Sequence, residues 1–184
     1  MALEATFREL SVCLHHLHDA LNALQVTMGD KPPDDESALA DGVETVVLDM
    51  MGTLHEGRKA ALNSKKAVGH PVDLDRARRT LTTCQERFHH IERQFAADLV
   101  SYEKLRELAR LGKERRPWLA WSSAVKQGIE QCRQPLEETS KALAVCWQEL
   151  VEHSGTTSIS VTNTGQRIVA RGSLTDEVFR ERTT

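Results

Sequence analysis

Apolar and polar residues alternate most regularly over residues 3–28, where apolar side chains recur in steps of four and three. Side chains three and four residues apart share one face of an α-helix, so the steps describe a heptad stripe on a helix. A stripe of this kind needs partner helices, from the same chain or from a second copy. The stripe consists of Leu3, Phe7, Leu10, Leu14, Leu17, Leu21, Leu24 and Met28.

The positions beside this stripe indicate the kind of partner that it requires. One flanking row consists of Thr6, Cys13, Ala20 and Thr27, all of them small. A two-stranded coiled coil usually carries long charged residues in such rows. Small residues widen the apolar face and let a second helix come close, which favours a bundle of several helices.

Three further helices are predicted, over residues 37–68, 73–111 and 117–153. Asp73 is expected to cap the third, and Pro117 to occupy the first position of the fourth. Pro135 keeps the phase of the fourth stripe, so a kink is expected there rather than a break. In the third helix the stripe is predicted to pass from Phe95 to Leu99, a stutter that relaxes supercoiling.

Glycines inside the second predicted helix are unfavourable for helix formation, by up to about 1 kcal/mol each relative to alanine. Gly42, Gly52 and Gly57 are interpreted as places where a neighbouring helix backbone packs closely. A local hinge is the alternative.

Short connections between long amphipathic helices predict an all-α fold, an antiparallel up-down-up-down four-helix bundle over residues 1–153. Residues 154–184 differ in character, because β-branched residues flank the turn sequence at 163–165. They predict a small C-terminal tail, with a β-hairpin over 156–171 and a short helix over 173–182.

The tail is the candidate recognition element, since a lone hairpin has open edges that accept another strand. Association with another protein, or with a second copy of this chain, is therefore expected through residues 154–184. A tail folded back on the bundle, or disordered, is the alternative. The candidate partner-binding residues are Ile159, Val161, Ile168, Val169, Leu174, Val178 and Phe179.

Composition adds limits on class and compartment. The chain has 184 residues, of which 4% are aromatic and 28% charged, and its net charge is −3. Its four cysteines form no CxxC pair and are interpreted as reduced core thiols. No apolar run suits a membrane span and no signal peptide is evident, so a cytoplasmic protein without membrane contact is expected.

Basic residues gather at the turn between the second and third predicted helices, a possible anion-binding site formed by Lys65, Lys66, Arg76, Arg78 and Arg79. A solvated helix end is the plainer interpretation. Aromatic residues are not interleaved with these cations, so nucleic acid is a possible partner but not a favoured one.

Candidate chemistry is sparse. His15 and His16 diverge by about 100° around a helix and do not chelate one ion easily. Glu86 and His89 match one Glu-x-x-His element of di-iron bundles, but the sequence lacks the second copy. No nucleophile elbow or phosphate-binding glycine loop occurs, so no metal, cofactor or catalytic residue is expected.

These patterns predict a non-enzymatic helical interaction module that acts as an adaptor, scaffold or assembly factor. The first alternative is a nucleic-acid or polyanion binder using the basic residues above. The second is a metal-dependent helical-bundle enzyme centred on His89.

Overall fold

The computed structural model describes residues 2–32, 38–69, 73–111 and 115–159, and no strand occurs within these ranges. Four helices make up the fold: α1 (Ala2–Gly29), α2 (Ala38–Val68), α3 (Leu74–Leu111) and α4 (Arg115–Ile159). They lengthen in chain order, from 28 residues in α1 to 45 in α4. The predicted all-α class and the four long helices are confirmed.

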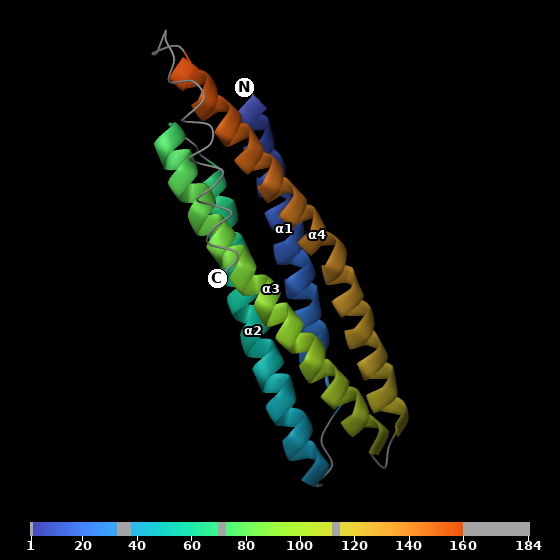
Figure 1. The fold of residues 1–184 in the computed structure, drawn as a ribbon. Helices are drawn as coiled ribbons and strands as arrows, with labels where there is room; N and C mark the ends of the chain where they lie inside the picture. The colour runs from blue at the N-terminus through green and yellow to red at the C-terminus, as the bar shows by residue number, and fades with distance from the viewer. Residues whose placement is uncertain (1, 33–37, 70–72, 112–114, 160–184) are drawn as a thin grey trace.

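Successive helices alternate in direction, and the fourth returns beside the first (Figure 1). The backbone of each helix lies close to those of its neighbours in sequence, and that of α4 lies close to that of α1, whereas the backbones of the diagonal pairs α1–α3 and α2–α4 stay farther apart. The four axes therefore form a closed square around one core. Each apolar stripe faces two neighbouring helices, which removes it from water.

The stripe of α1 forms the centre of this core. From Phe7 to Met28 every member of the stripe is at most 2% exposed, and only Leu3, at the start, is half-buried. The flanking small residues are half-buried as well, so the buried face is as wide as the sequence predicts.

Close helix approach occurs at a glycine that the sequence analysis passed over. A Cβ atom added to Gly128 of α4 would lie 2.8 Å from Leu24 Cδ1 and 3.7 Å from Leu24 Cα. At Gly57 the same atom would meet only the Leu21 and Ile91 side chains at ordinary contact distance, and at Gly52 it would meet nothing within 4 Å. The predicted approach of a neighbouring backbone is therefore wrong for Gly52 and Gly57.

The helix ends follow local chemistry with one correction. The backbone N–H of Arg76 donates to Asp73 Oδ1 at 2.7 Å, which confirms the predicted cap. Pro117 is the third residue of α4 rather than the first. As predicted, α4 continues through Pro135 without a break.

The end of α4 lies beyond the predicted end of the fourth helix. The helix runs to Ile159, beyond the expected end at 153, so residues 156–159 are helical and not the start of a hairpin. The strand preference of β-branched residues depends on context, and residues 156–159 continue the existing helix. The remainder of the predicted hairpin, and the predicted short helix over 173–182, lie outside the described residues.

Candidate functional site

The predicted stutter in α3 is wrong, because the stripe passes through Asp98, whose carboxylate is buried, and not through Leu99. The heptad steps continue from Phe95 through Asp98 to Tyr102, and Asp98 is only 3% exposed. Leu99, the predicted stripe member, is half-buried beside it. The regular spacing indicates position 98, but Asp98 is polar and was therefore not expected in the apolar stripe.

Asp98 reaches across the interface between α2 and α3. Thr53 Oγ1 lies 2.5 Å and 2.6 Å from the two carboxylate oxygens of Asp98 and 2.9 Å from the carbonyl oxygen of Met50. Thr53 has a single hydroxyl proton and donates it to only one of these acceptors at a time. A protonated Asp98 satisfies both contacts, because its own O–H then donates to Thr53 Oγ1 and the Thr53 hydroxyl donates to Met50.

Burial raises the pKa of Asp98 to about 6, against the opposing effect of the Thr53 hydrogen bond, which stabilises the carboxylate. A cavity of about 10 Å³ lies next to this pair, also lined by Leu21, Gly57 and Ile91. That volume is at the lower limit for a single water molecule. The cavity beside Asp98 therefore has no room for an organic substrate. The raised pKa of Asp98 affects the stability of the packed bundle instead.

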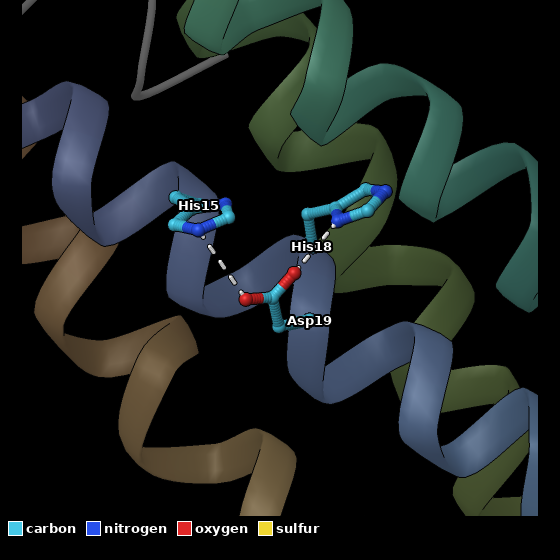
Figure 2. Close-up of side chains that lie close together, drawn as sticks. All are labelled: His15, His18 and Asp19. Carbon is cyan, nitrogen blue, oxygen red and sulfur yellow. Dashed lines mark hydrogen bonds and ion pairs between the residues drawn. The ribbon is translucent and has the colours of Figure 1, made fainter.

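A second polar cluster lies on the outer face of α1 (Figure 2). His15 Nε2 is 3.4 Å from Asp19 Oδ2, and His18 Nδ1 is 3.0 Å from Asp19 Oδ1. The carboxylate of Asp19 thus lies between the two imidazole rings, as Figure 2 shows. Residues 15, 18 and 19 share one face because the helix brings positions i, i+3 and i+4 together.

The neighbouring histidine stays outside this cluster. His16 is exposed, and its ring centroid is 6.3 Å from that of His15. The divergence of His15 and His16 was expected from the helix geometry. The sequence analysis missed the group at 15, 18 and 19 because it compared the histidines with one another and left out the aspartate.

The Glu-x-x-His element of α3 does not face the core. Glu86 and His89 are both exposed, and His89 Nδ1 lies 3.0 Å from Glu92 Oε2. Within the described part of the chain, the only group of three metal-binding side chains is His15, His18 and Asp19. The alternative of an enzyme with a core metal at His89 therefore has no support from the placement of its residues.

The four cysteines are free thiols, three of them buried and Cys13 half-buried. Burial raises the pKa of Cys84 and Cys146 to about 11 and that of Cys132 to about 12. Since the thiolate is the nucleophile, these buried thiols are poor nucleophiles near neutral pH. Their burial agrees with the prediction that they belong to the core.

The predicted anion-binding residues do share one end of the bundle. Lys65 and Lys66 lie in the last turn of α2, and three arginines lie in the first turns of α3, which runs antiparallel to α2. Lys65 is half-buried and the other four are exposed. None of the five forms an ion pair with another residue that the structure describes.

Of the predicted recognition residues of the tail, only Ile159 lies among the described residues. Ile159 is the last residue of α4, and Val161, Ile168, Val169, Leu174, Val178 and Phe179 lie outside the described residues.

Compared with known proteins, the chain matches no protein-family model, no curated protein and no solved structure. Within the described ranges, none of the four helices has the length and apolarity that crossing a bilayer requires.

Proposed function

We propose that this protein is a non-enzymatic, cytoplasmic helical interaction module whose C-terminal tail mediates association with another protein or with a second copy of the chain. The observation that supports the proposal is the completeness of the core. The buried apolar residues of all four helices form one cluster that begins at Phe7 and ends at Leu150. The stripes of the helices are thereby satisfied by one another.

The position of α4 adds to this argument. The helix continues from Leu150 to Ile159, past the last member of the core, and its end projects beyond the start of α1 (Figure 1). Val151 in this extension is 64% exposed. The last turns of α4 therefore lie outside the core, and we infer that the apolar side chains of the tail that follows in the sequence are available to a partner.

The test compares the full chain with a variant that lacks residues 160–184, which leaves α4 intact. We expect the two proteins to have the same helicity by circular dichroism and nearly the same melting temperature. Self-association in sedimentation velocity, or capture of a partner by the immobilised chain, is expected only for the full chain. A truncated bundle that unfolds, or that associates as well as before, would contradict the proposal.

Point variants refine the test and keep the chain length constant. The double variant Val178→Ser with Phe179→Ser is expected to weaken association, because it removes apolar anchors of the tail. The matched control is Glu177→Gln with Arg180→Gln, which alters neighbouring polar residues and is expected to preserve association. Equal effects in both pairs would argue against apolar anchoring.

A second candidate function is binding of a polyanion by the basic end of the bundle, favoured by exposed cations that lack ion pairs with described residues. The double variant Lys66→Glu with Arg78→Glu would then reduce retention on heparin and lessen its salt dependence. The control is Lys126→Glu with Arg133→Glu on α4, which makes the same charge change away from this end. Similar losses in both would indicate a nonspecific effect of net charge.

A further inference from the structure

We propose that His15, His18 and Asp19 form a surface site on α1 for a divalent transition-metal ion of the Zn²⁺ type. This inference is independent of the proposed association through the tail. The three residues follow the i, i+3, i+4 spacing of one helical face, so the helix fixes their Cα atoms relative to one another. Only side-chain rotation is then needed to adjust the site.

The donor atoms are already gathered. The nearest ring nitrogens of the two histidines and a carboxylate oxygen of Asp19 all lie within 4.8 Å of one another. Two ligands about 2.1 Å from a tetrahedral Zn²⁺ ion are about 3.4 Å apart. The exposed His15 and Asp19 side chains, 49% and 57% accessible, have the freedom to close the remaining difference.

The chemistry of the three donors selects the class of ion. Imidazole nitrogen suits Zn²⁺, Cu²⁺ and Ni²⁺, and one carboxylate completes a set of three protein ligands with a position open to water. Ca²⁺ takes six to eight oxygen ligands, which this face of α1 does not offer. We therefore take Zn²⁺ as the probe ion.

The surroundings of Asp19 bear on the affinity of the site. Its carboxylate oxygens lie 3.4 Å from His15 Nε2 and 3.0 Å from His18 Nδ1, so the anionic donor stands beside both nitrogen donors. Lys65 of α2 lies close enough to interact electrostatically with Asp19. Its positive charge opposes a bound cation, so it offers a way to tune the affinity.

The experiment is a calorimetric titration of the reduced full chain with ZnCl₂ in a buffer that does not bind metals. We expect one ion per chain with a dissociation constant in the micromolar range. His15→Ala, His18→Ala and Asp19→Asn are each expected to weaken binding by about tenfold or more, since each removes one of three ligands. The matched control is His16→Ala, which removes an exposed histidine of the same helix and is expected to leave the affinity unchanged.

Two further measurements separate this site from other binding. Lys65→Gln is expected to tighten Zn²⁺ binding a few-fold, because it removes the opposing charge. Co²⁺ in place of Zn²⁺ is expected to lack the near-ultraviolet absorption of a thiolate ligand, which distinguishes the site from Cys13. Circular dichroism of every variant checks that the helices remain folded.

Three results would overturn the proposal: binding only at millimolar Zn²⁺, an equal loss in His16→Ala and His18→Ala, or a thiolate absorption band with Co²⁺. A tail-deleted chain is expected to bind Zn²⁺ as the full chain does. Loss of association in that variant with retained metal binding keeps the outcomes of the two proposals distinct.

Discussion

Asp98 is the residue whose environment departs furthest from what its chemistry favours. Its pKa is raised from 3.8 to about 6, so the folded protein binds more protons than the unfolded chain between these values. The stabilising effect of the protonated carboxyl is fully present below pH 3.8 and is lost as the pH rises through 6. At neutral pH the ionised group is a net cost to folding.

Asp98→Asn is expected to raise the free energy of unfolding at pH 7 by roughly 1–3 kcal/mol. The amide donates to Thr53 Oγ1 without carrying a charge, and the Thr53 hydroxyl then remains with Met50. Urea denaturation at a series of pH values measures the change, which is expected to grow between pH 4 and pH 6 and then to level off. Asp49→Asn, at an exposed position of the neighbouring helix, is the control. A constant difference across the pH range would show that Asp98 does not titrate as described.

Two apolar residues of α1 differ in burial and therefore in their expected contribution to stability. Leu17 is fully buried, whereas Val26 is 59% exposed. Leu17→Ala is expected to lower the free energy of unfolding by roughly 2–5 kcal/mol, because it leaves a cavity in the core. Val26→Ala is expected to change it by less than about 0.5 kcal/mol. Thermal and chemical denaturation of the two variants decides the matter, and similar losses would mean that the heptad assignment is wrong.

At the scale of the helices, alanine substitutions at two glycines show how closely neighbouring helices approach. Gly52→Ala is expected to stabilise the protein by roughly 0.5–1 kcal/mol, since the new methyl group meets open space and alanine favours the helix. Gly128→Ala is expected to destabilise it by about 1 kcal/mol, because overpacking against the fully buried Leu24 exceeds the gain in propensity. The melting temperatures of the two variants measure these effects. Stabilisation by both substitutions would show that Leu24 of α1 moves easily to make room for the new methyl group of α4.

The sequence predicts these elements well because burial along a helix follows the heptad steps that can be read from it. Prediction from the heptad steps fails where a contact between two helices determines which residue a position tolerates. Asp98 is tolerated in the stripe because Thr53, on another helix, offers a partner, and Gly128 matters because α1 lies against it. Neither contact is visible within a single helix. The cluster at His15, His18 and Asp19 is different, because its local spacing was available in the sequence.

For the whole molecule, the closed arrangement of helices makes the thiols reporters of global unfolding. Cys84 lies in α3 and Cys132 and Cys146 in α4, all at most 1% exposed. Iodoacetamide is expected to modify Cys13 first under native conditions, and the other three only after unfolding. Mass spectrometry after timed labelling measures the rates in increasing urea. Three buried thiols with a common dependence on urea indicate one cooperative unit, and separate dependences would show that α3 and α4 unfold independently.

The return of α4 beside α1 has a mechanical consequence. The start of α1 and the last turns of α4 lie at the same end of the bundle, and the two helices are antiparallel (Figure 1). A force that separates Ala2 from Ile159 therefore acts across the seam between them and opens it one turn after another. In this unzipping geometry only the contacts at the opening edge bear the load at any moment. The bundle is expected to yield at a low force in single-molecule pulling from these two points, and at a higher force when the handles are attached at opposite ends of α1 and α4, where the seam must slide as a whole.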